Sequence, residues 1–386
     1  MEPTLRKIFL ISIIFVMLLS ACAPPPFTDN EVNSPEPVTS QNDAEPQESE
    51  PVGDAGLEFI DATGKQVSLP ALPERIVVAG KATPYVLDTI YLFPDAAKKL
   101  AALEVRGFDT QAFLELVDPN VTVKNMLERD AGPEQIAPHQ PDLVIVKNIS
   151  LGQLGAALEE ISIPVMGLNL ETPAFFYEDI HALGKVFGNS ERAEEIISYY
   201  QKIETQIGEM MSDLQDSDRP SVLVLQYSED GGEISFKVPP ASYLQTTMVQ
   251  NAGGNPIWLN VDAGADGWIQ VGLEQIAVWN PEVIFVVNYA GDSVETAQKL
   301  LQSPTWEGLQ AVVKEQVFGF PADFASWDLI DPRWILGQQW LATILQPERA
   351  AEINLQMQVV SFYEKLYGLS ETQIEESILP RLDEIK

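Results

Sequence analysis

The sequence predicts an α/β protein of two lobes with parallel sheets, joined by a single long α-helix. The first observation is an internal repeat, because residues 132–148 and 272–288 match at about half of their aligned positions. Each copy begins as a short helix at Gly-x-Glu, stops before a proline and continues into an apolar run ending in asparagine. Such a run is typical of a strand buried on both faces. A single pair of distant repeats predicts two similar lobes, and matching lobes usually enclose a cleft.

The second observation is an amphipathic stretch between the two repeats. Apolar residues recur at steps of three and four from Ala193 to Leu214, Ser190 fits the N-cap, and residues 216–220 stop the helix. About 25 residues give a rod of roughly 37 Å, which runs the length of a lobe. Lobes joined once by such a helix should move against each other less freely than lobes joined by several extended strands.

The elements of the first lobe follow in order along the chain. Residues 59–69 predict a hairpin around a glycine-containing turn. Strands are predicted at 76–79, 143–146 and 165–168, with helices at 84–92, 109–117 and 151–160. This alternation is typical of a parallel sheet with crossover helices.

The second lobe repeats the alternation. Strands are predicted at 222–226, 283–287 and 317–320, with helices at 243–251 and 273–279. Two long amphipathic helices are predicted at 333–345 and 348–366.

The amino-terminal residues have the pattern of an export segment. Arg6 and Lys7 precede an apolar run too short to span a bilayer, which predicts a signal peptide over residues 1–21. The following Leu-Ser-Ala-Cys resembles the lipobox of bacterial lipoproteins, which implies lipidation of Cys22 and a lipid anchor on the extracytoplasmic face of the cell membrane. An ordinary membrane anchor or a cleaved signal is the alternative.

Composition divides the rest of the chain. Residues 22–56 are mostly proline, acidic and small polar residues, which predicts a disordered tether behind the lipidated cysteine. We predict a first lobe over 57–188, an inter-lobe helix over 189–215 and a second lobe over 216–386. Cys22 is the only cysteine, so an exported protein of this sequence has no disulfides.

Charge and missing motifs exclude several functions. The net charge of −34 argues against nucleic acid as a partner. The sequence lacks the Gly-x-Ser-x-Gly, His-Glu-x-x-His and phosphate-loop motifs, so we expect no catalytic residues and no enzyme. The two histidines, His139 and His181, lie far apart and cannot build an imidazole metal site, although an all-carboxylate site stays open. We therefore expect no cofactor and no metal bound directly by side chains.

Several segments together resemble a known family. They are Arg75-Ile-Val-Val, the two Glu-Gln-Ile-Ala segments with their following strands, and the single bridging helix. In this order, and with the lipobox, they resemble the ABC-transporter substrate-binding proteins of the iron-siderophore, haem and cobalamin class. The resemblance covers about residue 57 to the carboxyl terminus. It implies two Rossmann-like lobes with the ligand between them, and an ABC permease in the cytoplasmic membrane as partner; we expect a monomer.

The repeated glutamates, Glu134 and Glu274, each fall in the first turn of a predicted helix. A carboxylate there is favoured by the helix dipole by about 0.3–1 kcal/mol, which alone would explain one glutamate. In the family, one surface glutamate per lobe docks onto arginines of the permease, and these two residues match those positions. The resemblance therefore implies that Glu134 and Glu274 dock the protein onto its permease.

Basic and aromatic residues near strand ends are candidates for ligand binding, because ligands sit outside the carboxyl ends of strands in open α/β sheets. The segment 324–334 also looks like the Trp-Asp-x-x-x-Pro-Arg segment that borders the cleft in relatives. The candidates are Lys81, Arg106, Lys147, Tyr227, Tyr289, Trp327 and Arg333. Arginine can bind carboxylates or phosphates through two parallel hydrogen bonds, and tryptophan provides a flat apolar face. The alternative is that Trp327 fills the core and that Arg333 pairs with Asp328 or Asp331.

These predictions combine into a receptor that captures a small-molecule metal chelate and delivers it to an ABC importer. An oxyanion such as molybdate or tungstate is the alternative ligand. A receptor or adhesin that has lost its transporter, and a chelate-processing enzyme, are alternatives of other classes.

Overall fold

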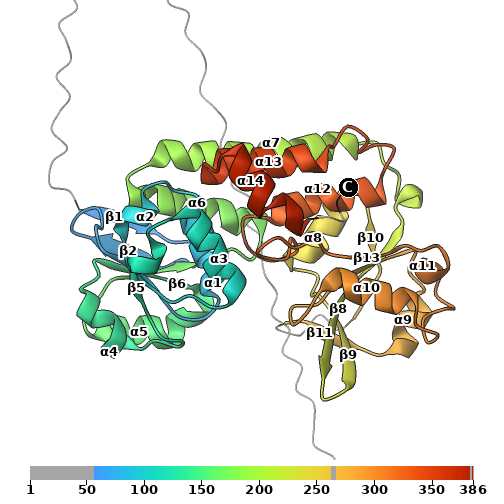
Figure 1. Ribbon diagram of the computed structural model, residues 1–386, viewed down its shortest axis with the longest axis horizontal. Helices are drawn as coiled ribbons and strands as arrows, with labels where there is room; N and C mark the ends of the chain where they lie inside the picture. The colour runs from blue at the N-terminus through green and yellow to red at the C-terminus, as the bar shows by residue number, and fades with distance from the viewer. Residues whose placement is uncertain (1–55, 262–266, 383–384, 386) are drawn as a thin grey trace, which may run out of the picture. The chain divides into compact units, whose positions relative to one another are not determined.

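The computed structural model describes residues 56–261, 267–382 and 385. The predicted signal peptide, Cys22 and residues 22–55 lie outside these residues. The predicted hairpin forms from β1 (Leu57–Ile60) and β2 (Gln66–Leu69), which pair antiparallel. A five-stranded sheet of the first lobe follows in the order β5-β4-β3-β6-β7, and all its pairings are parallel (Figure 1).

The first sheet contains the three strands predicted from apolar runs and two that were missed. The strands are β3 (Ile76–Val78), β4 (Leu100–Leu103), β5 (Asn125–Met126), β6 (Leu143–Lys147) and β7 (Val165–Leu168). The missed β4 reads Leu-Ala-Ala-Leu directly after the short helix α2 (Ala96–Lys99), and alanine is uncommon in strands, so it resembled helix. β5 is two exposed residues at the sheet edge, too short to show a pattern.

Helices connect these strands. They are α1 (Thr83–Ile90), α3 (Phe108–Val117), α4 (Pro133–Ile136), α5 (Ala156–Glu160) and α6 (Pro173–Phe187). The inter-lobe helix α7 (Ser190–Met210) begins one residue earlier than an N-cap at Ser190 implies, because the Asn189 side chain, and not that of Ser190, accepts the capping hydrogen bond from the Arg192 amide.

The second sheet corrects the expectation that both sheets are wholly parallel. Its order is β11-β9-β8-β12-β13, with β10 beside β8, and β9 runs antiparallel to β8 and β11. The turn between β8 and β9 uses Gly231 and Gly232, both with positive φ (58° and 87°). Two such residues suit the tight turn of a hairpin, and this Gly-Gly pair was the overlooked signal. The strands are β8 (Ser221–Asp230), β9 (Glu233–Val238), β10 (Asn255–Pro256), β11 (Ile269–Val271), β12 (Val283–Val287) and β13 (Val317–Gly319).

Among the described residues, seven α-helices accompany the second sheet. They are α8 (Leu244–Asn251), α9 (Leu273–Trp279), α10 (Ser293–Leu301), α11 (Gln310–Val313), α12 (Trp334–Leu345), α13 (Leu355–Tyr367) and α14 (Glu371–Ser377). The last long helix was expected from residue 348 but begins at Leu355, where the Asn354 side chain accepts a hydrogen bond from the Met357 amide. In the part of the chain that the structure describes, no helix is long and apolar enough to cross a bilayer.

The internal repeat is also a structural repeat. In each copy the helical segment ends at a residue in the left-handed conformation, which is Gln140 (φ 49°) after α4 and the 3-10 turn Ala137–His139, and Asn280 (φ 43°) after α9. The proline that follows leads into β6 or β12, and each strand pairs parallel with the first parallel strand of its lobe, β3 or β8. The sequence repeat therefore identified two lobes built to one plan.

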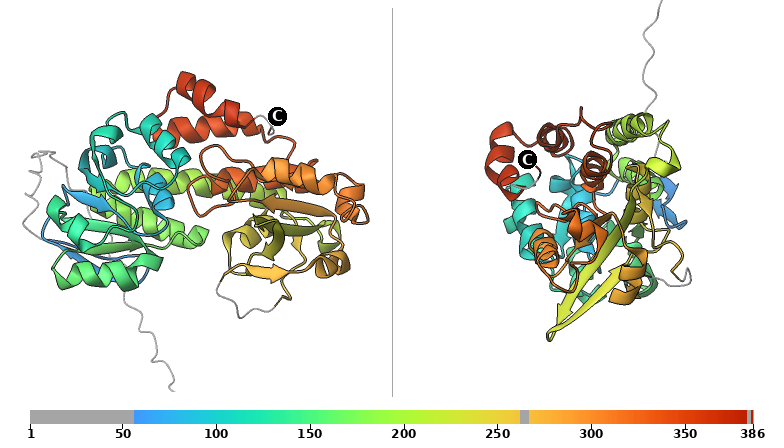
Figure 2. Two further views of the ribbon diagram at one scale, coloured as in Figure 1. Left: turned by 60° about the horizontal axis from the view of Figure 1, so that its bottom comes forward. Right: turned by 90° about the vertical axis from the view of Figure 1, so that its right-hand side faces the viewer.

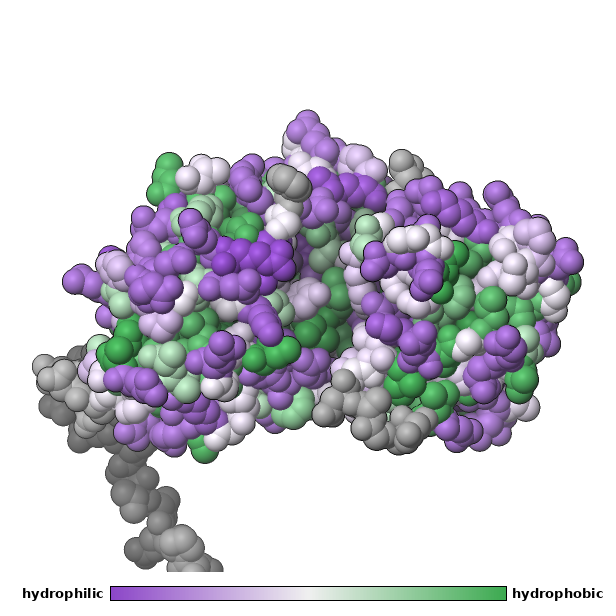
Figure 3. Space-filling view, turned by 90° about the horizontal axis from the view of Figure 1, so that it is seen from below, coloured by the Kyte–Doolittle hydropathy of each residue, from purple (hydrophilic) through white to green (hydrophobic). Residues whose placement is uncertain are grey.

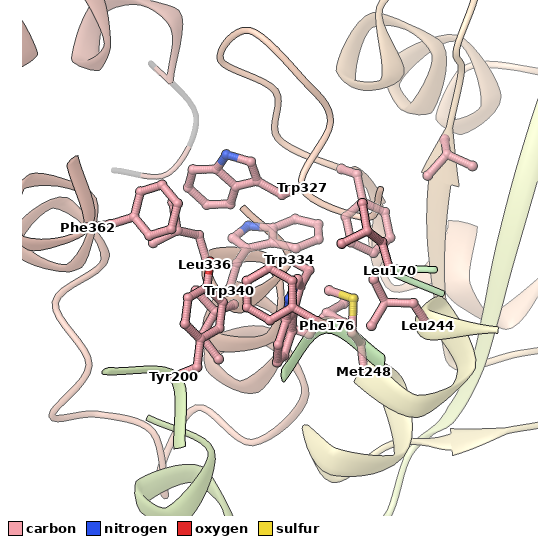
Figure 4. Close-up of a cluster of buried hydrophobic side chains, with 14 of the residues drawn as sticks. Leu170, Phe176, Tyr200, Leu244, Met248, Trp327, Trp334, Leu336, Trp340 and Phe362 are labelled. Atoms are coloured by element: carbon pink, nitrogen blue, oxygen red, sulfur yellow. The ribbon is translucent and has the colours of Figure 1, made fainter. Parts of the chain in front are cut away.

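The larger of two hydrophobic clusters among the described residues runs through both lobes. Phe176 of α6, Tyr200 of α7 and Trp334 of α12 contact one another there, with ring centroids 4.7–6.1 Å apart (Figure 4). The C-terminal helices also lie beside the first lobe (Figure 2). Tyr363 and Tyr367 of α13 lie edge-on to Phe113 of α3, with ring centroids 6.2 and 5.0 Å apart. The lobes are therefore held together by α7 and by this second set of contacts.

Candidate ligand-binding site

A cavity of about 600 Å³ lies between α1 and α3 of the first lobe and the loops that follow β12 and β13 of the second. It lies near the carboxyl ends of strands, where open α/β sheets bind ligands. Its volume falls within the range of about 300–1,000 Å³ that is usual for small-molecule sites. The residues used below that line it are Tyr85, Asp88, Asp109, Tyr289, Asp292, Phe320, Asp323, Phe324 and Arg381. Figure 3 shows one face of the molecule, hollowed near its centre, with apolar residues in the hollow.

The cavity combines aromatic faces with an excess of carboxylates. Tyr289 is 43% exposed, and its hydroxyl donates a 2.5 Å hydrogen bond to Asp328. The ring is partly exposed, but desolvation of the hydroxyl and the buried Asp328 carboxylate that it contacts raise the pKa of Tyr289, so its hydroxyl remains a donor. Arg381 is the one cation among the described lining residues; it bonds Asp109 at 3.2 Å and stacks on Phe324 at 4.1 Å.

Arg333 lies behind the cavity wall and is fully buried. Its guanidinium contacts Asp88 of α1 at 2.5 Å, Asp331 at 2.8 Å and Asp323 at 2.7 Å, and it donates a 2.9 Å hydrogen bond to the Tyr363 hydroxyl. The pairing with Asp331 is the alternative considered from the sequence. In this conformation Arg333 therefore joins the two lobes and does not line the cavity in which a ligand could contact it.

Trp327 also lies in the interior. It is fully buried among the apolar side chains that Figure 4 shows. Its indole nitrogen donates a 3.3 Å hydrogen bond to Asp323. Neither Trp327 nor Arg333 lines the cavity, so neither is carried into the site proposed below.

The basic candidates of the first lobe are largely occupied by neighbours. The Lys147 ammonium is buried and contacts Asn148, Asn169 and Glu171 at 2.9, 2.5 and 2.5 Å, which uses its three donors. Burial lowers the pKa of Lys147, although Glu171 opposes the effect.

Two further basic candidates lie near each other in the first lobe. Arg106 pairs with Glu104 at 2.5 Å and Asp130 at 2.8 Å. Lys81 is exposed and makes no ion pair with any residue between 56 and 382 that the structure describes. It lines a separate cavity of about 240 Å³, which Asp130 also lines.

Of the seven sequence candidates, Tyr289 alone lines the 600 Å³ cavity. Tyr227 lies on β8, and its hydroxyl donates a 2.8 Å hydrogen bond to Glu229. Tyr85, Asp88 and Arg381 were missed. Tyr85 could have been found as the second residue of the helix predicted after the first parallel strand, whereas nothing in the local sequence marks Arg381.

Glu134 and Glu274 are exposed in the first turns of α4 and α9. Among the described residues, neither carboxylate makes an ion pair or hydrogen bond. Both helices lie toward the lower side in Figure 1. The described residues contain no cluster of three or more histidine, cysteine or acidic side chains arranged to hold a metal ion.

Two buried carboxyls make stability depend on pH. Burial raises the pKa of Asp331 to about 7 and that of Asp179 to about 8. The folded protein therefore binds these protons more tightly than the unfolded chain, whose aspartates titrate near 3.9. The free energy of unfolding should thus fall as the pH rises from about 4 to about 8.

Asp179→Asn should reduce this pH dependence, because an amide keeps the acceptor for the Asn169 and Leu170 amides, both at 2.8 Å, and cannot ionise. Urea unfolding at pH 5 and pH 8 measures the change. Asp216→Asn, at an exposed position, is the control. Equal loss of stability with pH in the parent and in Asp179→Asn would contradict the assignment.

Two lobes on one plan with a cavity near their strand ends define a bilobed binding protein. The sequence profile of the periplasmic binding protein family matches residues 91–324. The chain therefore belongs to that family, as the resemblance implied, and is a periplasmic binding protein of the ABC-transporter type that works outside the cytoplasm.

Individual relatives are more distant. The molybdate-binding protein MolA of Haemophilus influenzae is 25% identical over 259 residues, which span 61% of this chain and 70% of MolA. A periplasmic solute binding protein from Veillonella parvula has a TM-score of 0.68 at 22% identity, covering 84% of this chain and 98% of its own. MolA bound to molybdate has a TM-score of 0.65 at 20% identity, with 81% and 98% covered. Helicobacter pylori CeuE has a TM-score of 0.65 at 15% identity, with 84% and 99% covered. The structural matches support the fold.

Proposed function

We propose that this protein is the solute-binding component of an ABC importer and that it captures a metal chelate of the iron-siderophore, haem or cobalamin type. The main observation that supports this proposal is the 600 Å³ cavity between the lobes. Its volume and its aromatic faces suit a ligand with flat or apolar parts. The protein then presents the loaded cavity to the permease, and it needs no catalytic residue for this task.

The charges of the cavity favour a chelate over a compact oxyanion. Four carboxylates line the cavity, those of Asp88, Asp109, Asp292 and Asp323. Among the described residues, only two cations offset them: Arg381 in the lining, which bonds Asp109, and the buried Arg333 behind the wall, which pairs with Asp88 and Asp323. An oxyanion gains its affinity from free donors and cations, and the acidic wall would repel it. A neutral or cationic chelate avoids that repulsion.

Molybdate is the second candidate ligand, because the MolA relative is named for binding it. A receptor without a transporter remains an alternative of another class. Uptake measurements in a strain deleted for this protein distinguish that alternative from an importer component.

Titration of the purified protein with a ferric siderophore, haem, cobalamin and molybdate, followed by tryptophan fluorescence, tests the ligand. We expect saturable binding of a chelate and none of molybdate. Tyr289→Ala should weaken chelate binding about tenfold through loss of an aromatic face. Tyr227→Ala, which does not line the cavity, is the matched control and should leave affinity unchanged. Binding of molybdate and of no chelate would contradict the proposal and show that the ligand is an oxyanion.

The anchor belongs to the same proposal, since a lipid on Cys22 would hold the receptor beside its membrane partner. Replacing Cys22 by serine should release the protein from membranes or leave it unprocessed. Metabolic labelling with palmitate and membrane fractionation check this. Unchanged labelling and fractionation would rule out the lipoprotein assignment.

A further inference from the structure

Each exposed glutamate of the repeat has a glycine two positions before it. The glutamate carboxylate lies close to the position that a Cβ on that glycine would take. A Cβ built on Gly132 would meet both carboxylate oxygens of Glu134, with Oε1 at 2.7 Å. A Cβ built on Gly272 would meet Oε2 of Glu274 at 3.1 Å. The carboxylate thus folds back over the glycine in both lobes and occupies space that any other residue would fill.

The backbone does not itself require glycine at these positions. Gly132 has φ −92° and ψ 179°, and Gly272 has φ −92° and ψ 163°. These angles lie in the extended region that any residue adopts. The absence of a side chain, and not conformational freedom, is therefore what these two glycines contribute.

The rest of the turn is built in the same way in both lobes. The Ile136 amide donates to the Gly132 carbonyl, and the Ile276 amide donates to the Gly272 carbonyl, both at 3.1 Å. Both isoleucine side chains are fully buried and fix the helix starts. Because the glutamate carboxylates have no partner among the described residues, the space above the glycine is what allows their observed position.

We infer that Gly132 and Gly272 are positioning residues, which set where Glu134 and Glu274 present their carboxylates to the permease. The inference rests on the proposed docking role of the glutamates. A methyl group at either position displaces the end of a flexible side chain, so the fold is kept while the carboxylate moves. The tighter contact at Gly132 makes the first lobe the more sensitive of the two.

The test measures uptake by the host carrying full-length variants, with radiolabelled ferric siderophore, haem, cobalamin and molybdate as probes. Gly132→Ala should reduce uptake of the imported probe about tenfold, the effect of losing a charged hydrogen bond, and Gly272→Ala should reduce it less. Solute affinity and thermal midpoint should be unchanged. Gly132→Ser adds the same Cβ with a favourable N-cap oxygen and should match Gly132→Ala. Gly152→Ala and Gly308→Ala, at exposed glycines with open space around them, are the controls.

A double variant separates this inference from the docking proposal. In a Glu134→Gln background, Gly132→Ala should cause no further loss, because the glycine acts through the carboxylate. An additive loss, or a crystal structure of Gly132→Ala with the Glu134 carboxylate in its original place, would overturn the inference. If Glu134→Gln itself leaves uptake unchanged, or if no probe depends on the protein, the docking proposal fails and the inference fails with it.

Discussion

Replacing Arg333 by alanine should lower the free energy of unfolding by about 3–5 kcal/mol, the usual cost of removing one partner of a buried ion pair. Three buried carboxylates, those of Asp88, Asp323 and Asp331, contact the fully buried guanidinium. Without Arg333 they would be left as buried charges beside one another, or would take up protons. Urea unfolding at pH 7.5 measures the loss.

Arg349→Ala is the control for this prediction. Arg349 pairs with the exposed Asp213, so its removal should cost no more than about 1 kcal/mol. Adding Asp88→Asn to Arg333→Ala should recover part of the stability, because one buried charge fewer remains. A loss in Arg333→Ala no greater than in Arg349→Ala would show that the network contributes little.

Changing Glu134 or Glu274 to arginine should reduce uptake by about 10–100-fold while solute affinity stays the same. A carboxylate facing a permease arginine would become a like-charge contact, which costs several kcal/mol. Both glutamates are exposed and lie outside the cavity, so the ligand should not sense the change. Uptake assays and solute titrations on the same variants separate the two effects.

Glu191→Arg is the matched control, since Glu191 is an exposed glutamate in the first turn of another helix, α7. It should leave uptake unchanged. Loss of solute affinity in the Glu134 or Glu274 variants would place these residues in ligand binding and contradict docking.

Most of the fold could be predicted from local sequence patterns. The runs at 165–168 and 283–287 coincide with β7 and β12, because buried parallel strands are continuously apolar. The antiparallel β9 was missed because only two of its six residues are buried and its signal lies in the glycine turn before it. The inter-lobe helix was predicted to within a few residues, since its apolar spacing is regular.

The site was harder to predict, because proximity to a strand end does not say which way a side chain points. Lys147 directly ends β6, yet its ammonium turns to Glu171 in its own lobe. Arg333 precedes a helix of the second lobe and reaches Asp88 on α1, a partner far away in the sequence. Such choices depend on tertiary contacts that no local pattern encodes.

The contact of Phe113 with Tyr363 and Tyr367 has a consequence for how the chain acquires its structure. Synthesis is vectorial, so α3 emerges long before α13 exists to cover it. The first lobe should therefore remain an incomplete intermediate, with aromatic surface uncovered, until almost the whole chain has been made. A fragment ending before residue 355 should be prone to proteolysis and aggregation, even though it contains every strand that the structure describes.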